Sequence, residues 1–328
     1  MLKPIPAIVV AAVAGGGYYF LSNYEVKREE TRIVIARRDG EPIGSPLANR
    51  PPLTDPHRLT LRLATFNPGP LDRMKLGSPL IASHLATLIR DFDVVAIQGL
   101  HGPNQGLVRD LIRHVNAAGG NYDFAVGPEV GAESIESYTA ILFDAGRIDI
   151  DRSTVRTVDD PAGRLTHRPL MALFRARGPA PDEAFTFLLV NIQVDPARVE
   201  MELDLLDDVH AAARASHPDE DDVILLGNFQ TDGSRSGQLA RIPTLAWAAA
   251  NTVSMTRGAG LVDNIVFDRR ATTELTGRGG VVDLVRRLNL SIDEAATVSE
   301  HMPVWVEASV FEGGQSGRIA ADEPNHLR

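Results

Sequence analysis

The sequence predicts an α/β fold in which two packed mixed β-sheets are flanked by helices, as a four-layer sandwich. Three observations favour this fold. Strand-like and helix-like hydrophobic patterns alternate along most of the chain. Some connections are short enough for hairpins, whereas others are long enough for helical crossovers. The 328 residues are 44% hydrophobic and contain no internal repeat, so we expect one domain of about 250 residues with a large core.

The first half of this domain begins with a strand. Residues 58–67 (RLTLRLATFN) alternate between polar and apolar side chains, with the period of two that is typical of a half-buried strand. Ser78 and Pro79 then predict a helix start, because a capping side chain is followed by proline at the first helical position. A buried strand is expected at residues 93–98, and a second helix at residues 104–114 is closed by a pair of glycines.

The second half continues this alternation. Residues 197–216 place apolar side chains on one face and many carboxylates on the other, which predicts a helix with a solvated acidic face. A shorter helix is expected near residues 281–288. The remaining apolar runs predict strands at residues 122–126, 138–144, 185–193, 222–227, 264–268 and 303–310.

The charge of the chain limits the partners that it can bind. Its 43 acidic and 33 basic residues give a formal net charge of −10, which disfavours bulk binding of nucleic acid because such binding depends on neutralising phosphates. Nearly all basic residues are arginines, which can still pair with a single phosphate or carboxylate, so a small anionic ligand or a protein partner remains open. Cysteine is absent, which excludes disulfides, thiolate metal sites and a cysteine nucleophile.

The N-terminal segment differs from the rest of the chain. Residues 4–23 carry no charge and end near the aromatic pair Tyr18 and Tyr19, as expected for a membrane span with an interfacial belt. Residues 1–24 are therefore predicted to be a single-pass transmembrane anchor, with the side of the membrane undetermined. The alternatives are a signal peptide cleaved near AVA at residues 12–14 and a buried soluble helix, which three consecutive glycines disfavour.

Three further segments follow the predicted anchor. Residues 25–57 are charged and then proline-rich, with one strand-like run at residues 33–36, and predict a juxtamembrane linker. Residues 58–311 form the predicted domain. Residues 312–328 are polar and glycine-rich, and predict a disordered tail.

Four short segments at the ends of predicted strands carry the polar residues that point to a function. They are VVAIQGLHG at residues 94–102, LLVNIQVDP at 188–196, VILLGNFQTD at 223–232 and VSEHMPVWV at 298–306. In order and spacing they resemble the blocks IQE, NxHxDP, GDFNxD and SDHxPV of the endonuclease/exonuclease/phosphatase superfamily. The resemblance implies the deoxyribonuclease-like fold and a site that, when intact, hydrolyses phosphate esters with a metal ion.

The resemblance also implies that most chemical groups of such a site have changed. Gly99 replaces the glutamate that is the principal metal ligand of the superfamily, and glycine has no side-chain oxygen to offer. Gln193 replaces a histidine and cannot transfer a proton. The other changed positions are Asn228 in place of aspartate, Gln230 in place of asparagine and Val262 in place of tyrosine.

A remnant of the site is expected where the chain matches the superfamily. His301 and Asp263 resemble its histidine and the aspartate that orients that histidine. Asn67 ends the first strand as in the superfamily, and Glu136 and Tyr138 match residues of the strand that carries the partner of the lost histidine. Each match also has a structural explanation, because a histidine beside a carboxylate is more often structural than catalytic.

The sequence leaves three functions open. Because several catalytic groups have changed together, it favours a membrane-anchored pseudoenzyme that uses the former catalytic site for binding and needs no cofactor. The alternative is a magnesium-dependent phosphodiesterase or phosphatase with a rearranged metal site, built from Glu300, the weak candidate ligand, with Asp263 and either Asp195 or Asp232. The third is a purely structural envelope protein without a ligand. Binding of a divalent ion distinguishes the pseudoenzyme from the hydrolase, because a working hydrolase of this kind must hold a metal ion.

Overall fold

The computed structural model describes residues 24–29, 32–37, 58–102, 105–127, 137–249, 252–258 and 260–314. The chain divides into two units, residues 1–51 and residues 52–328. In the first unit, β1 (Tyr24–Glu29) and β2 (Arg32–Arg37) form an antiparallel pair. The strand-like run predicted at residues 33–36 lies within β2, whereas β1 falls in a segment that the sequence analysis assigned to the linker without a strand.

The predicted transmembrane anchor lies almost entirely outside the described residues. Residues 1–23 are not described, and Tyr24, the last residue of the predicted span, begins β1. Among the helices that are described, none has the length and apolar character needed to cross a membrane. The anchor therefore stays a prediction.

The first sheet of the second unit contains six strands in the order β13-β14-β3-β4-β6-β5. β3 and β4 are parallel neighbours, as expected for two strands joined by a helical crossover, and the other neighbouring pairs are antiparallel. Their bounds are β3 (Thr60–Phe66), β4 (Val94–His101), β5 (Tyr122–Val126), β6 (Ser137–Asp144), β13 (Leu275–Val281) and β14 (Val304–Ser309).

The second sheet also contains six strands, in the order β11-β12-β10-β9-β8-β7. β9 and β10 are its parallel pair, and their crossover carries two helices. The bounds are β7 (Ile148–Thr157), β8 (Leu170–Ala176), β9 (Thr186–Gln193), β10 (Val223–Asn228), β11 (Leu245–Trp247) and β12 (Asp263–Asp268).

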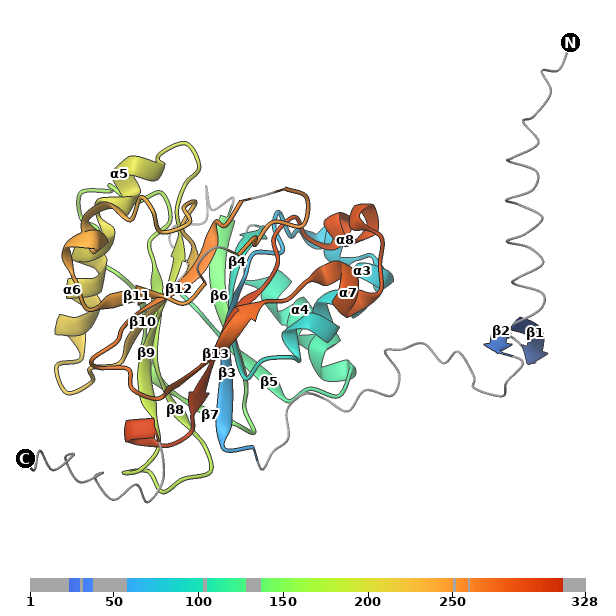
Figure 1. The fold of residues 1–328 in the computed structure, drawn as a ribbon, viewed down its shortest axis with the longest axis horizontal. Coiled ribbons are helices and arrows are strands. Elements are labelled where there is room, and N and C mark those ends of the chain that lie inside the picture. The colour runs from blue at the N-terminus through green and yellow to red at the C-terminus, as the bar shows by residue number, and fades with distance from the viewer. Residues whose placement is uncertain are drawn as a thin grey trace, which may run out of the picture. The chain divides into compact units, whose positions relative to one another are not determined.

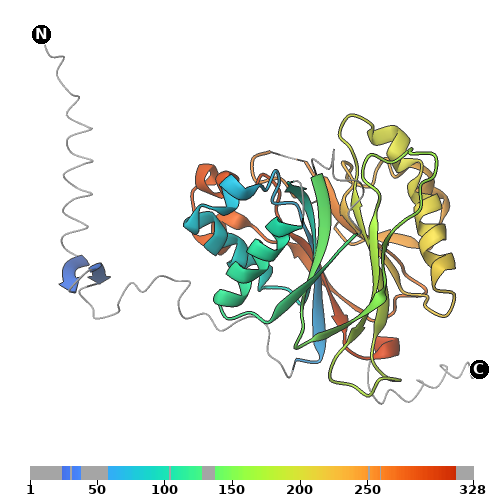
Figure 2. The same cartoon turned by 180° about the vertical axis from the view of Figure 1, so that it is seen from behind.

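Helices cover the outer face of each sheet, which completes the predicted four-layer sandwich (Figures 1 and 2). One buried cluster lies between the sheets and contains the stacked rings of Phe174, Phe185 and Phe187. Two further clusters fill the space between each sheet and its helices. The helices on the first sheet are α2 (Arg73–Leu76), α3 (Pro79–Ile89), α4 (Gly106–Ala117), α7 (Leu284–Leu288) and α8 (Ile292–Val298), and those on the second are α5 (Val199–Leu203) and α6 (Leu206–Ser216).

Four strands of the two sheets were not predicted from the sequence. β7 and β13 are edge strands with few apolar residues, and β11 is an edge strand of only three residues. β8 is an inner strand that is largely apolar, and it was missed as well. The helix predicted at residues 197–216 is interrupted between α5 and α6. The unpredicted helix α8 begins with a capping box in which Ser291 and Glu294 bond each other's backbone.

The C-terminal boundary of the domain lies beyond the predicted residue 311. A short 3-10 helix, η2 (Glu312–Gly314), follows β14, and its first residue contacts the rest of the domain. The backbone N–H of Glu312 donates to the carbonyl of Glu183, and the carboxylate of Glu312 accepts from the N–H of Thr186 at 3.2 Å. Of the predicted disordered tail, residues 315–328 lie outside the described part.

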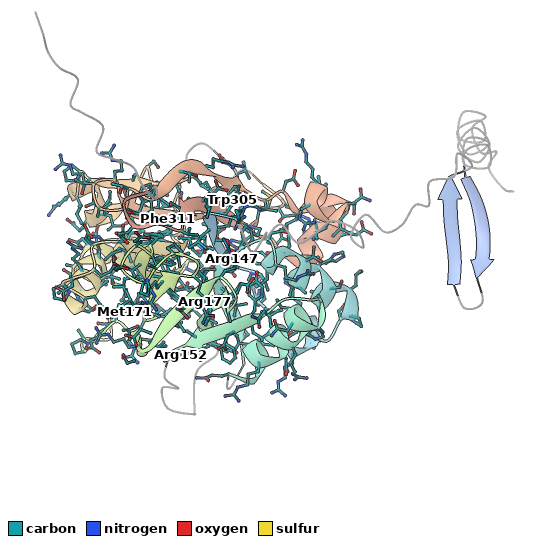
Figure 3. The ribbon with its side chains drawn as sticks, turned by 90° about the horizontal axis from the view of Figure 1, so that it is seen from below. Arg147, Arg152, Met171, Arg177, Trp305 and Phe311 are labelled. Atoms are coloured by element: carbon teal, nitrogen blue, oxygen red, sulfur yellow. The ribbon has the colours of Figure 1, made fainter. Side chains whose placement is uncertain are left out.

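A buried charge cluster holds the starts of β3 and β4 next to β7. Asp93, directly before β4, is fully buried, and its carboxylate accepts hydrogen bonds from the Arg58 side chain, from the Arg62 backbone at 2.6 Å and from Arg147 Nε at 3.3 Å. Burial raises the pKa of Asp93, whereas the charges of Arg58 and Arg147 and the bond from Arg62 oppose this rise. Arg147, labelled in Figure 3, also donates to the carbonyl of Thr60 at 2.6 Å and so joins the two sheets.

Candidate functional site

The structure brings most of the sequence-predicted site residues to one end of the two sheets. Asn228, the last residue of β10, is in register with Gln193 at the end of β9 and with Asp263 at the start of β12. His301 lies directly beside Asn228 and Asp263, and Gly99 in β4 contacts Gln193. The candidate site is defined here as Asn67, Gly99, Gln193, Asn228, Gln230, Asp263 and His301.

His301 and Asp263 form the most ordered part of the candidate site. His301 Nδ1 lies 2.8 Å from Asp263 Oδ2, and the Asp263 side chain is fully buried while that of His301 is 14% exposed. Ser254 Oγ donates to Asp263 Oδ2 at 3.1 Å, and Asn228 Nδ2 donates to Oδ1 at 2.8 Å. A carboxylate that accepts from Nδ1–H fixes the tautomer of the imidazole and leaves Nε2 as an acceptor for a ligand.

Asn228 and Gln230 form a neutral amide pair beside this histidine. Gln230 Nε2 donates to Asn228 Oδ1 at 2.6 Å, and Asn228 itself is almost fully buried. Gln230 adopts φ +56°, in the left-handed region, which costs a residue with a side chain about 1–2 kcal/mol. The pair therefore holds a defined and strained geometry without contributing any charge.

Gln193 bridges three strands where the superfamily pattern has a histidine. Its Oε1 accepts from the backbone N–H of Gly99 at 3.2 Å, and its Nε2 donates to Ser137 Oγ at 3.3 Å. β9 is thereby tied to both β4 and β6 across the gap between the sheets. Glu136, which the resemblance implies as a partner of the lost histidine, lies outside the described residues.

Gly99 occupies a position that excludes any side chain. Its φ is +66°, and β4 has a register shift against β6 between Ile97 and Leu100. A Cβ placed on Gly99 would lie 2.4 Å from Asn67 Oδ1 and 2.9 Å from Gly69 Cα. Asn67 is itself held there, because its Oδ1 accepts from the N–H of Gly69 at 3.0 Å. The space next to residue 99 is thus filled by the segment that follows β3.

Two buried amides below the candidate site join the sheets and were not recognised in the sequence. Gln98 Nε2 donates to Asn191 Oδ1 at 2.7 Å, and both residues are fully buried. Asn191 Nδ2 then donates to the carbonyls of Ile97 and Ala140. A polar residue inside each of the apolar runs VVAIQ and LLVNI is the sequence signal that could have identified them.

Other sequence-predicted residues do not contribute chemical groups to the candidate site. Tyr138 packs with the cluster between the first sheet and its helices, and burial raises its pKa to about 12. Val262 contributes backbone bonds, including a carbonyl that accepts from the N–H of Phe229 at 2.8 Å. Ser254, which nothing in its loop sequence marked, donates to the Asp263 carboxylate instead.

The carboxylates proposed for a rearranged metal site have other partners. Glu300 pairs with Arg257 at 2.9 Å, and the same guanidinium pairs with Asp293 at 2.8 Å. Asp195 accepts from Thr166 Oγ1 at 3.0 Å and from the backbone N–H of Ala197, and the latter bond is the main cause of its lowered pKa. These carboxylates are bound to local donors rather than converging on one point.

Asp232 shows the same pattern, because its Oδ1 accepts from the N–H of Ser234 at 2.9 Å. Within the described residues, the two groups of three carboxylates with metal-ligand spacing both include Asp222 and neither includes a residue of the candidate site. Asp222 precedes β10, at the end opposite to Asn228. The residues of the candidate site therefore do not fit the divalent metal that the superfamily resemblance implies.

Known proteins resemble this chain in sequence and in fold, although no family model matches it. Deoxyribonuclease-1-like 1 of Chlorocebus aethiops is 24% identical over 263 residues, covering 76% of this chain and 85% of the relative. Deoxyribonuclease-1 of Bos taurus is 23% identical over 266 residues, covering 76% and 92%. An endonuclease/exonuclease/phosphatase family protein from Bacteroides thetaiotaomicron superposes with a TM-score of 0.53 at 15% identity, covering 76% and 94%. In sequence this chain is thus similar to deoxyribonuclease-1 relatives, and in fold it is similar to a protein of the endonuclease/exonuclease/phosphatase family.

Proposed function

We propose that this protein is a pseudoenzyme of the superfamily, in which the candidate site binds a ligand instead of hydrolysing a phosphate ester. The observation that carries the proposal is the geometry at Gly99. A side chain there would be strained at φ +66°, and its Cβ would lie 2.9 Å from the backbone Cα of Gly69 and 2.4 Å from Asn67 Oδ1, so the segment after β3 would have to shift. The neutral amides of Gln193, Asn228 and Gln230 support the same proposal, because they neither transfer protons nor attract a divalent ion strongly.

The ligand that best suits the candidate site is a small anion. The amide groups of Asn228 and Gln230 lie beside His301, and an amide N–H is a donor suited to an anionic oxygen. Lys75, the only lysine after residue 27, lies nearby and donates to the carbonyl of Pro68, the residue after Asn67. Burial lowers the pKa of Lys75, and the carboxylates of Asp72 and Glu300 oppose this change. A cation close to neutral amides suits a phosphate or carboxylate group, and the net charge of −10 disfavours a long polyanion.

Hydrolysis by the unmodified full-length chain tests this proposal. With Mg²⁺ or Mn²⁺ and with DNA or bis-p-nitrophenyl phosphate as substrate, we expect a rate at least about 10⁴-fold below that of deoxyribonuclease-1 of Bos taurus, because a base and a metal ligand are both missing. The measurement is initial rate against enzyme concentration. Turnover that depends on metal and disappears in His301→Ala, but persists in the exposed control His114→Ala, would contradict the pseudoenzyme proposal.

The alternative function is a hydrolase that still uses the His301–Asp263 pair. The 2.8 Å contact between them favours it, because a histidine oriented by a buried carboxylate is the arrangement of a general base. The two functions differ in calorimetry. Inorganic phosphate binding to the metal-free protein, weakened in His301→Gln and unchanged in His114→Gln, supports the binding function, whereas binding that requires Mg²⁺ supports the hydrolase.

We further propose that the N-terminal segment anchors the protein in a membrane. Residues 4–23 are uncharged, and an uncharged span of this length satisfies its backbone as a helix in lipid. Because the chain is acidic, anionic lipid repels the domain, so attachment depends on the span alone.

Deletion of residues 2–24 is therefore expected to move the full chain from the membrane pellet to the soluble fraction after ultracentrifugation. Deletion of the polar residues 315–328 at the other terminus is the control and should leave the protein in the pellet. A full-length protein that is already soluble, or a mature N-terminus near Gly15 by mass spectrometry, contradicts the anchor and supports a cleaved signal.

A further inference from the structure

The end of the sheets opposite to the candidate site contains carboxylates from three distant segments. Asp222 precedes β10 in the second sheet, Glu274 precedes β13 in the first sheet, and Glu312 follows β14. Ligand oxygens of these three side chains all lie within 4.8 Å of one another. Phe311, labelled in Figure 3 where the molecule is seen from below, is the residue next to Glu312. The three carboxylates are far apart in the sequence and come together because each lies next to an end of β10, β13 or β14.

Two of these carboxylates are buried with an oxygen that lacks a partner. Asp222 is 1% exposed and Glu274 is 2% exposed. Among the described residues, neither Asp222 Oδ1 nor Glu274 Oε2 accepts a hydrogen bond of ordinary geometry, although the Thr272 hydroxyl interacts with the Asp222 carboxyl. An unpaired buried carboxylate oxygen is strongly unfavourable, so buried carboxylates are normally paired with a cation, protonated or bound to a metal ion.

The charged groups next to this cluster are themselves acidic. Burial, together with the carboxylates of Glu274, Glu220 and Glu312, raises the pKa of Asp222 to about 8, although a hydrogen bond from the Thr272 hydroxyl opposes the rise. Burial also raises the pKa values of Glu274 and Glu312, and the carboxylate of Asp221 adds to both increases, while backbone donors oppose them. A cation among these three carboxylates would relieve the cost of their burial.

Backbone donors hold two of the three carboxylates in place. Glu274 Oε1 accepts from the N–H of Gly313 at 2.6 Å, and Glu312 Oε2 accepts from the N–H of Thr186 at 3.2 Å. Glu220 Oε1 accepts from the backbone N–H of Asp222 at 2.9 Å, which fixes the turn before β10. The carboxylates of Glu274 and Glu312 are thus oriented by the chain, while Glu274 Oε2 and Asp222 Oδ1 make no hydrogen bond within the described residues.

We propose that Asp222, Glu274 and Glu312 bind one divalent cation, Ca²⁺ in preference to Mg²⁺, which cross-links the two sheets at the end remote from the candidate site. Oxygen-only ligands suit a hard cation. Ca²⁺ accepts an irregular shell of six to eight oxygens, whereas Mg²⁺ demands near-ideal octahedral geometry and keeps several waters, so three carboxylates from separate segments suit Ca²⁺ better. Glu312 is exposed and provides the route of entry from solvent.

This proposal is independent of the proposed function, because none of the three carboxylates belongs to the candidate site. Its test uses the full-length protein after removal of metals with EDTA, titrated with CaCl₂ by calorimetry and followed by thermal unfolding. We expect one Ca²⁺ per chain and a rise in Tm of about 5–10 °C at a hundredfold excess over Kd. MgCl₂ should give a smaller rise at the same concentration.

Variants separate this site from general ion effects. Asp222→Asn and Glu274→Gln keep the shape of the side chain and should abolish both the binding heat and the rise in Tm. The exposed variant Glu312→Gln, which leaves the buried pair intact, should fold normally and weaken Ca²⁺ binding at least about tenfold. Asp208→Asn, which changes an exposed carboxylate on α6, should bind as the unmodified protein does.

The proposal is overturned if the unmodified protein shows neither binding heat nor a rise in Tm with Ca²⁺ or Mg²⁺. It is equally overturned if Glu312→Gln binds Ca²⁺ as tightly as Asp208→Asn. In either case the Asp222 and Glu274 carboxyls hold a proton in the folded protein instead of a metal ion, since one of the two must be neutralised.

Discussion

Replacing Asp93 with alanine is expected to lower the free energy of unfolding by about 3–5 kcal/mol, because the change leaves two guanidinium groups buried without their shared carboxylate. The side chains of Arg58 and Arg147 are only 16% and 6% exposed, so water compensates poorly for the lost partner. The measurement is urea-induced unfolding of the full-length chain followed by circular dichroism, analysed for the transition of the larger unit.

The matched control is Asp123→Ala, which also breaks an aspartate–arginine pair. Asp123 pairs with Arg152 on the surface, where the two side chains are 51% and 50% exposed, and an exposed pair contributes roughly 0–1 kcal/mol. If the two variants lose similar stability, the buried cluster does not fix the starts of the strands as we infer.

The second large loss of stability is expected when a methyl group is added at Gly99 in the candidate site. Gly99→Ala should reduce the free energy of unfolding by about 2–5 kcal/mol, as the sum of left-handed backbone strain and of overpacking against Asn67 and Gly69. Gly163→Ala is a close control, since Gly163 has φ +61° but nothing within 4 Å of the added Cβ. It should lose only the backbone contribution of about 1–2 kcal/mol.

A double-mutant cycle identifies the contact that excludes the side chain. Asn67→Ala removes the Oδ1 atom that lies 2.4 Å from the added Cβ, so the combination with Gly99→Ala should be less destabilising than the sum of the two single changes. Chemical denaturation of the unmodified protein, the two single variants and the double variant gives the coupling free energy between residues 67 and 99. Strict additivity would show that Asn67 does not fill the space beside residue 99.

The fold could be predicted because the central strands and the main helices carry strong periodic patterns. Val94–His101 and Thr186–Gln193 are buried along nearly their full length, so both are visible as apolar runs. Two edge strands, Ile148–Thr157 and Leu275–Val281, were missed since polar residues and glycine dominate them, and the inner strand Leu170–Ala176 was missed although it is largely apolar. Their pairing is decided by neighbouring strands, which a local pattern does not contain.

For the candidate site, the sequence predicted which residues lie near each other, but it did not predict their orientations and contacts. The blocks predicted that Gln193, Asn228 and His301 lie near each other, and the register of β9, β10 and β12 gives the reason. The direction of Tyr138 toward the helix layer depends on the register of β6, and the positive φ of Gly99 depends on the bulge in β4. Neither property is encoded in the spacing of residues.

The close approach of Gly99 and Gly69 has a consequence for how the chain can evolve. Once the segment after β3 has settled beside residue 99, any codon change that adds a side chain there produces a less stable intermediate, even if that side chain is glutamate. A loss of several kcal/mol is a large fraction of the 5–15 kcal/mol that holds a typical domain folded. A glutamate at residue 99 therefore needs coordinated changes at residues 67, 69 and 99, and a single substitution rarely reaches a stable protein with a carboxylate at this position.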